Sequence, residues 1–139
     1  MRTQAVVRCI IIKGDSIVLC RNTIRDFYSL PGGGLELGET INQGIVRELG
    51  EEMGLTPEQI HIHDDSFFAY EHTVVADGEE FYGIDLLKRV DMDSDVVENV
   101  LDYDAIKFEL VKFSDLPNLR IPLYPEPARN YLLEKFCKK

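Results

Sequence analysis

The segment 32–54 restricts the fold of this 139-residue chain more than any other, because three consecutive glycines lead into a helix whose two ends are both marked. Thr40 and Gln43 have the spacing of a capping box, and Gly54 stands where helices commonly end. Between these ends an apolar residue recurs every four positions, which is the pattern of a helix with one buried stripe. The stripe consists of Ile41, Ile45, Leu49 and Met53. We therefore expect a helix over residues 40–53 that packs by this stripe against the rest of the fold.

Two glycines, Gly44 and Gly50, lie inside this expected helix. Each costs about 1 kcal/mol of helix stability relative to alanine. Because intrinsic propensity does not favour glycine there, something else must hold the helix. Close packing against a sheet, or a bound ligand, would do so.

Segments rich in β-branched and aromatic residues occur on both sides of the helix and predict strands. These segments are 5–12, 16–21, 66–76, 81–90 and 107–113. Gly14-Asp15 and Asp77-Gly78 are turn signals that would join four of them into two hairpins, whereas 22–29 reads as a polar loop. A second apolar stripe predicts a C-terminal helix over about residues 126–137. Strands, one central helix and one terminal helix together predict an α/β sandwich.

Composition places the chain among globular proteins, with 45% hydrophobic and 29% charged residues. We find no repeat or linker, so residues 1–139 are expected to form a single domain. The longest apolar run is Cys9 to Ile12, and the N-terminus has no signal-peptide pattern, so no membrane association is expected. Three scattered cysteines do not make a disulfide framework, which favours a cytoplasmic location.

Acidic residues outnumber basic ones by 25 to 15, which gives a formal net charge of −10. Such a chain is a poor electrostatic partner for nucleic acid or for anionic membranes. The excess is local: residues 33–55 hold five acids and one base, and residues 91–104 hold six acids and no base. A cluster of carboxylates on a helix calls for a specific explanation.

The carboxylates of Glu48, Glu51 and Glu52 lie at spacings i, i+3 and i+4, on one side of the expected helix. Like charges at this spacing repel, and a hard divalent cation such as Mg²⁺ or Mn²⁺ would remove the conflict. Arg47 precedes Glu51 by four residues and can orient its carboxylate. The alternative is a solvated acidic face with no ligand.

The whole stretch from Gly33 to Leu55 resembles the Nudix box, G-x5-E-x7-R-E-U-x-E-E-x-G-U, at every defined position, where U is a bulky apolar residue. Glu39 and Arg47 stand at the positions of the box that precede the glutamate cluster. The approach through Tyr28 and Pro31 also resembles the family's lead-in, and the strand order is similar to the family's α/β/α sandwich with a mixed sheet.

The resemblance implies a Nudix hydrolase that cleaves a nucleoside diphosphate linked to another group by attack of water at phosphorus. It implies Glu48, Glu51 and Arg47 as catalytic residues, with Glu48 slightly preferred as general base. Mg²⁺, with Mn²⁺ as a substitute, would be held by Gly32, Glu48, Glu51 and Glu52. Glu39 would have a structural or outer role. Which glutamate is the base differs within the family, so this choice stays open.

Several weaker signals concern the substrate. Arg25 could contact phosphate, and Tyr28 and Tyr70 could contact the nucleotide; Tyr70 stands about fifteen residues after the box, where a tyrosine resembles the diadenosine-polyphosphate type. In the second acidic segment, Asp93, Asp95 or Glu98 could add a ligand to the metal site.

We therefore expect a Mg²⁺-dependent pyrophosphohydrolase acting on a (d)NTP or a dinucleoside polyphosphate. The alternative is a non-catalytic nucleotide-binding or regulatory module on the same fold. The expected partners are a small-molecule nucleotide and, as an option that the sequence leaves open, a second copy of the chain in a homodimer.

Overall fold

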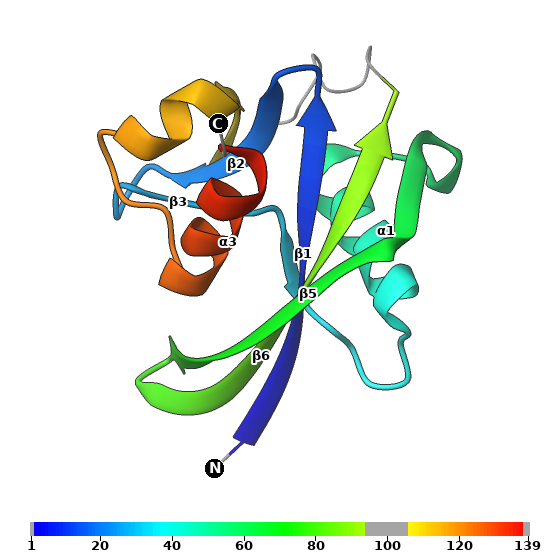
Figure 1. Ribbon diagram of the computed structural model, residues 1–139. Coiled ribbons are helices and arrows are strands. Elements are labelled where there is room, and N and C mark those ends of the chain that lie inside the picture. Colours follow the sequence, from blue (N-terminus) through cyan, green and yellow to red (C-terminus); the bar gives the residue numbers. More distant parts are fainter. Residues whose placement is uncertain (1, 94–105, 138–139) are drawn as a thin grey trace.

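The computed structural model describes residues 2–93 and 106–137 (Figure 1). Its strands are β1 (Arg2–Lys13), β2 (Ser16–Asn22), β3 (Phe27–Ser29), β4 (Gly32–Gly34), β5 (Ile60–Ala76), β6 (Glu79–Met92) and β7 (Ile106–Lys112). Its helices are α1 (Ile41–Met53) and α3 (Glu126–Phe136), with short 3-10 turns η1 (Pro57–Gln59) and η2 (Phe113–Asn118).

The sheet is mixed and open, with the order β3-β2-β1-β6-β5. Strand β1 runs parallel to β6 and antiparallel to β2 and β4, whereas β5 and β6 form a long antiparallel hairpin. Strand β7 pairs with β2, and β4 pairs with β1. Helices α1 and α3 lie on opposite sides of the central strands in Figure 1, which confirms the predicted α/β/α sandwich.

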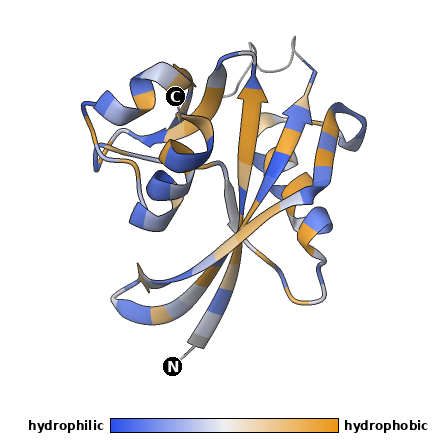
Figure 2. Cartoon of the chain, viewed as in Figure 1, coloured by the Kyte–Doolittle hydropathy of each residue, from blue (hydrophilic) through white to orange (hydrophobic). Residues whose placement is uncertain are grey.

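Two hydrophobic cores, one on each face of the sheet, hold the helices in place. Along β1, Val7, Cys9 and Ile11 are fully buried in the core that contains the α1 stripe residues Ile45 and Leu49. The intervening Ile10 belongs to the second core, which contains Ala128 and Leu132 of α3. Because successive side chains of a strand point to opposite faces, a strand covered on both sides is a nearly continuous apolar run, which Arg8 interrupts in β1. Figure 2 shows this hydrophobic colouring along much of β1.

The predicted ends of α1 are confirmed. Thr40 is the N-cap, and its hydroxyl and the Gln43 side chain make both hydrogen bonds of a capping box. Gly54 ends the helix with a φ of 69°, in the left-handed region that favours glycine. The turn between β5 and β6 has positive φ at both Asp77 and Gly78, as predicted from that dipeptide.

One local prediction was wrong. The segment expected as a polar loop between residues 22 and 29 contains a short strand, β3, whose three residues pair with β2. Its side chains therefore alternate between two faces, which affects the substrate residues discussed below. In the part of the chain that the structure describes, no helix has the length and apolar character needed to cross a membrane.

Candidate active site

The glycines of β4 and the glutamates of α1 face one another across a narrow gap. The Gly32 amide donates a hydrogen bond to Glu52 Oε1 at 3.2 Å. A β-carbon on Gly33 would lie 2.5 Å from Glu48 Oε1, and one on Gly32 would lie 1.9 Å from the Val7 carbonyl oxygen. Only glycine therefore lets β4 approach both β1 and the helix this closely.

Arg47 connects the helix to the glycine strand and to the surrounding acids. Its Nη2 donates to the Gly34 carbonyl at 2.8 Å, and its Nε donates to Glu39 Oε2 at 2.7 Å. Its Nη1 donates to Glu48 Oε1 at 2.9 Å and approaches Glu51 Oε2 at 3.4 Å. Both Glu39 and Glu48 are largely buried, whereas the Glu51 side chain is 61% exposed. Arg47 therefore fixes the first two acids more firmly than the third.

Glu52 is an acid in an unfavourable electrostatic position. Burial and the neighbouring Glu48 carboxylate raise the pKa of Glu52 to about 8, against the opposing effects of Arg8 and the Gly32 amide. Arg8 is held nearby, since its Nη1 donates to the Leu30 carbonyl at 3.1 Å. Two carboxylates placed together in this way favour a shared proton or a shared cation.

These residues fit a hard divalent cation. Glu48 and Glu52 offer carboxylate oxygens, the donor type that Mg²⁺ and Mn²⁺ prefer. Within residues 2–93 and 106–137, no group of three or more His, Cys, Asp or Glu side chains stands ready to enclose a metal. Mg²⁺ usually keeps several waters and binds through one or two carboxylates together with substrate phosphates, so a preformed cage is not required.

A cavity of about 560 Å³ opens beside Glu52 and Gly32. Its lining mixes apolar and aromatic side chains with polar and charged ones, among them Asn22, Ser29, Thr73 and Glu126. Its lining also includes Arg8, Phe27, His72, Ile106, Tyr124 and Pro125. Glu52 thus lines a hollow of a size that ligand sites commonly have.

Two rings of this cavity come from segments almost a hundred residues apart. The Tyr28 amide donates to the Pro122 carbonyl at 2.7 Å, and the Tyr124 amide donates to the Tyr28 carbonyl at 2.8 Å. This backbone pairing brings Tyr124 beside Phe27, with ring centroids 5.8 Å apart. Because β3 alternates, Phe27 points into this cavity and Tyr28 does not.

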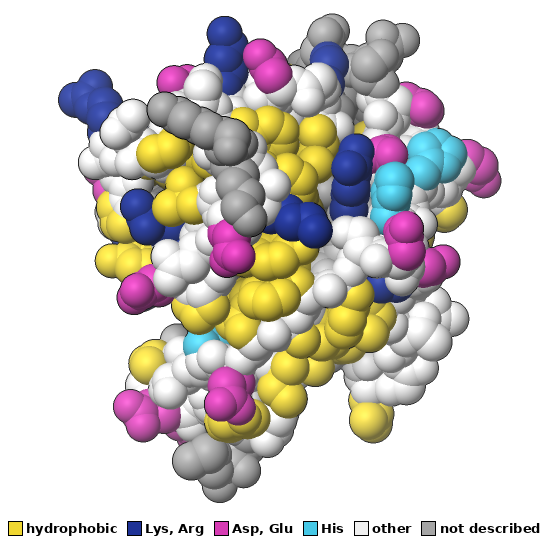
Figure 3. Space-filling model, viewed as in Figure 1, with side chains coloured by type: hydrophobic (Ala, Val, Ile, Leu, Met, Phe, Trp, Pro, Cys, Tyr) yellow, Lys and Arg dark blue, Asp and Glu magenta, His cyan; other side chains and the backbone are white. Residues whose placement is uncertain are grey.

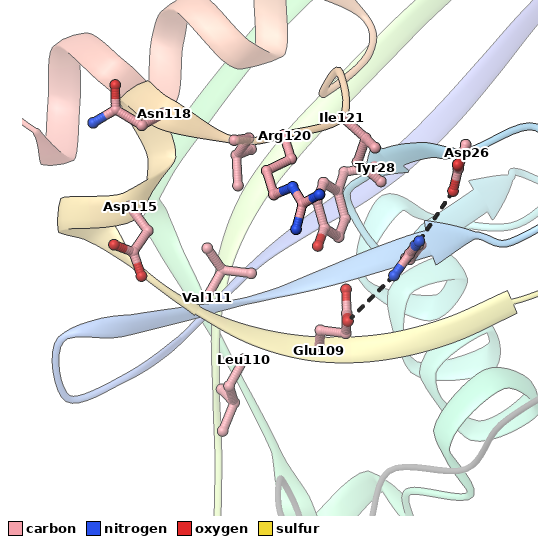
Figure 4. A pocket seen from close by; sticks show the side chains of 11 residues that line it. Asp26, Tyr28, Glu109, Leu110, Val111, Asp115, Asn118, Arg120 and Ile121 are labelled. Atoms are coloured by element: carbon pink, nitrogen blue, oxygen red, sulfur yellow. Dashed lines mark hydrogen bonds and ion pairs between the residues drawn. The ribbon is translucent and has the colours of Figure 1, made fainter.

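Tyr28 instead lines a second cavity, of about 630 Å³, on another part of the surface (Figure 4). There Arg21 contacts Asp26 at 3.0 Å and Glu109 at 4.0 Å. Burial and hydrogen bonding to Glu109 raise the pKa of Tyr28 to about 12. Neither Glu48 nor Glu52 borders this second cavity.

The other predicted substrate residues also have defined positions. Arg25 is exposed in the turn before β3, where its amide donates to Asn22 Oδ1 at 2.9 Å, and it lines neither of the two cavities. Tyr70 packs in the core beneath α3 and donates its hydroxyl to Asp85. The structure therefore gathers Gly32, Glu48 and Glu52, and leaves Arg25, Tyr28 and Tyr70 outside that group.

The second acidic segment lies mostly outside the described residues. Asp93 is exposed just after β6. Asp95 and Glu98, proposed from the sequence as further metal ligands, fall outside the residues that the structure describes. Their contribution to the site stays a prediction.

Sequence reasoning missed Arg8, Phe27, His72 and Tyr124, which line the cavity beside Glu52. An isolated charged residue in the apolar segment 5–12 is a usable signal for Arg8. Phe27, His72 and Tyr124 have no such signal in the sequence. Each reaches the cavity through strand pairing or backbone contacts that no local pattern encodes.

A model of the NUDIX domain matches residues 2–131. The chain is 25% identical over 122 residues to the uncharacterized Nudix hydrolase YvcI of Bacillus subtilis (strain 168), covering 88% of this chain and 73% of that protein. It is 42% identical over 52 residues to the ADP-ribose pyrophosphatase of Methanocaldococcus jannaschii, covering 35% of this chain and 31% of that protein. The crystal structure of the MutT protein from Methanosarcina mazei Go1 has a similar fold, with a TM-score of 0.71, 20% identity and coverage of 98% and 94%.

With nearly its whole length matched, the chain belongs to the NUDIX domain family. It is a Nudix hydrolase, an enzyme acting on phosphoric anhydrides. The family assignment agrees with the complete box read from the sequence and with the position of its glutamates beside the glycine strand.

Proposed function

We propose that this chain is a Mg²⁺-dependent pyrophosphohydrolase that cleaves a (d)NTP or a dinucleoside polyphosphate. The observation that carries the proposal is the Glu48–Glu52 pair, packed against Gly33 and Gly32, with Glu52 lining a cavity that also contains the aromatic rings of Phe27 and Tyr124. A diphosphate binds to a cation that carboxylates hold, and a nucleoside binds in a partly apolar cavity. In this chain the carboxylates and the cavity adjoin.

Glu48, Glu52 and the Gly32 carbonyl would hold Mg²⁺ or Mn²⁺, with Glu51 as a further ligand from the rim. When bound, such an ion neutralises charge on the phosphoryl oxygens and acidifies water near neutral pH. The raised pKa of Glu52 supports this assignment, because a cation would relieve the repulsion that raises it.

Glu48 is our preferred general base. Its carboxylate is largely buried, and Arg47 holds its Oε1 at 2.9 Å, so the group that would accept a proton from water is held in place. Arg47 positions this carboxylate and, less closely, that of Glu51. Glu39 in turn fixes Arg47 and has an outer, structural role.

The nucleoside would occupy the cavity, against Phe27 and Tyr124. The substrates in the names of related proteins differ, and the similarity to the ADP-ribose pyrophosphatase covers 35% of this chain. The choice of a nucleotide therefore rests on the two aromatic rings of this cavity. All three cysteines of the chain are free thiols, which supports a reducing compartment such as the cytoplasm.

A panel of nucleotides tests the proposal. The panel contains the common NTPs and dNTPs, diadenosine tetraphosphate, ADP-ribose and a non-nucleoside diphosphate, each with millimolar Mg²⁺ and with EDTA. We expect Mg²⁺-dependent cleavage of an NTP or dNTP, detected as released phosphate or pyrophosphate, or of diadenosine tetraphosphate, detected as the two nucleotides that its hydrolysis leaves. Hydrolysis of the non-nucleoside diphosphate or ADP-ribose alone would reject the proposed substrate class, and equal rates in EDTA would reject the metal dependence.

A further inference from the structure

Asp85 on β6 is a buried carboxylate that binds two side chains of the neighbouring strand. Its side chain is 1% exposed. The Tyr70 hydroxyl donates to Asp85 Oδ2 at 2.7 Å, and His72 Nε2 lies 2.8 Å from Asp85 Oδ1. Burial and this contact with Asp85 raise the pKa of the Tyr70 hydroxyl, which therefore remains a donor. Both oxygens of the carboxylate are thus engaged.

Strand register places this group on the sheet face that α3 covers. Asp85 pairs with Tyr70 across the β5–β6 hairpin, and His72 pairs with Gly83. Because Gly83 has no side chain, the strand beside His72 leaves space at that point. His72 is 23% exposed, and it lines the same cavity as Glu52.

The contact with Asp85 determines which nitrogen of His72 faces a ligand. A carboxylate only accepts hydrogen bonds, so the Nε2 that contacts it carries the proton. In the neutral ring Nδ1 is then an acceptor. Among the residues that the structure describes, none makes a hydrogen bond to His72 Nδ1. Asp85 therefore presents His72 to the cavity as a hydrogen-bond acceptor.

The cavity that His72 lines offers surface for a flat ring as well as a phosphate end. Gly32 and Glu52 mark the phosphate end of the cavity, whereas Phe27, Tyr124 and Pro125 give apolar and aromatic surface elsewhere. His72 adds an acceptor of fixed position to a lining that also includes Asn22, Ser29, Thr73 and Glu126. An acceptor held in one place pairs with a donor on the ring. Exocyclic amino groups are the donors that distinguish one nucleobase from a close analogue.

Resting on the proposed function, we propose that His72 is a specificity-determining residue that accepts a hydrogen bond from an exocyclic amino group of the substrate's base, and that Asp85 is its positioning residue. The expected ligand is a nucleotide whose base carries such an amino group. The preference arises because an analogue without it leaves Nδ1 unpaired.

The test measures kcat and KM for matched triphosphate pairs at pH 8.5. The pairs are adenosine and purine riboside, guanosine and inosine, and cytidine and uridine. We expect the wild type to favour the amino member of at least one pair by about tenfold in kcat/KM, mainly through KM.

Three variants separate specificity from folding. His72→Gln keeps an amide group near the Nε2 position, where it can still bind Asp85, and has no acceptor at the Nδ1 position. For this variant the ratio of kcat/KM between the two members of a pair should fall to near one. Asp85→Asn should also lower the ratio, because an amide donates as well as accepts and no longer fixes one tautomer. Tyr70→Phe removes the other bond to Asp85 and should keep the wild-type ratio. Thermal unfolding monitors the fold of each.

An unchanged ratio in His72→Gln overturns the role of His72, and an unchanged ratio in Asp85→Asn overturns its positioning. Absence of a preference in all wild-type pairs rejects the amino-group readout while leaving the pyrophosphohydrolase intact. A wild type that hydrolyses no nucleotide rejects both this inference and the proposed function.

Discussion

At the residue scale, the site depends on the absence of a side chain at Gly33. The position that a β-carbon would take lies 2.5 Å from Oε1 and 2.7 Å from Oε2 of Glu48, closer than real β-carbons approach other atoms. Glu48 is also bound by Arg47, so it cannot move away without breaking that contact. The glycine run of the sequence therefore has a specific physical purpose here.

We expect Gly33→Ala to lower kcat by about 100-fold, because a displacement of about 1 Å in a catalytic group has effects of this size. The control is Gly34→Ala, whose β-carbon would meet only the movable end of Gln4 and which keeps the backbone carbonyl that Arg47 binds. Steady-state kinetics on the best substrate checks both. Equal activity in the two variants would show that Glu48 does not need its present position.

Residue identities in the box were predictable because they lie within one helix and the strand before it. Glu48 and Glu52 are one helical turn apart, so sequence spacing alone placed them on one side. The weaker position of Glu51, which is 61% exposed beside Arg47, was not predictable. It depends on where β4 passes the helix, and that is a tertiary contact.

At the scale of elements, α1 is held by its packing and its caps despite two internal glycines. Gly44 is buried, and a β-carbon there would lie 2.3 Å from Leu35 Cδ2. At Gly50 the nearest atom to such a carbon is the Leu55 carbonyl oxygen, at 3.4 Å, an ordinary contact. Close packing therefore accounts for the glycine at position 44 and not for the one at position 50.

The two glycines should therefore respond in opposite ways to alanine. We expect Gly50→Ala to raise the free energy of unfolding by about 0.5–1 kcal/mol, through helix propensity. Gly44→Ala should lower it by about 1 kcal/mol, because the β-carbon would meet both Leu35 and, at 3.2 Å, the Glu39 Oε1 that Arg47 holds, and this overpacking outweighs the same gain. Urea unfolding measures both values, and changes of equal sign would contradict this assignment.

Element boundaries show which patterns are sufficient on their own. The capping box at Thr40 and the Asp77-Gly78 turn were read correctly, because both rest on contacts within a few residues. The polar residues 22–29 predict a loop, whereas three of them form strand β3 because they pair with β2. That error hid the alternation by which Phe27, and not Tyr28, reaches the cavity beside Glu52.

At the scale of the whole molecule, the acidic charge is concentrated rather than general. Residues 33–55 and 91–104 together account for the net charge of −10, so the rest of the chain is balanced. Figure 3 shows acidic and basic side chains interspersed around a hydrophobic area on the face that it presents. An acidic protein can bind a polyphosphate when its local excess of carboxylates first binds cations.

The fold class was predictable from the order of strands and helices, together with a box that fixes one helix and one strand. The cavity was not, because β1, β3, β5 and the segment before α3 contribute one or two residues each. Arg8, His72 and Tyr124 meet there through the register of the sheet and the backbone bonds of Tyr28. Those pairings are set by the complete tertiary structure.

The central claim is that the glutamates of α1 carry a metal-dependent hydrolysis. Its most direct test compares kcat/KM of Glu52→Gln with that of the wild type on the best nucleotide, at saturating Mg²⁺. The matched control is Glu58→Gln, an exposed acid in η1 that borders neither cavity. We predict a loss of about 100-fold or more for Glu52→Gln and none for Glu58→Gln. Wild-type activity in Glu52→Gln would contradict the account.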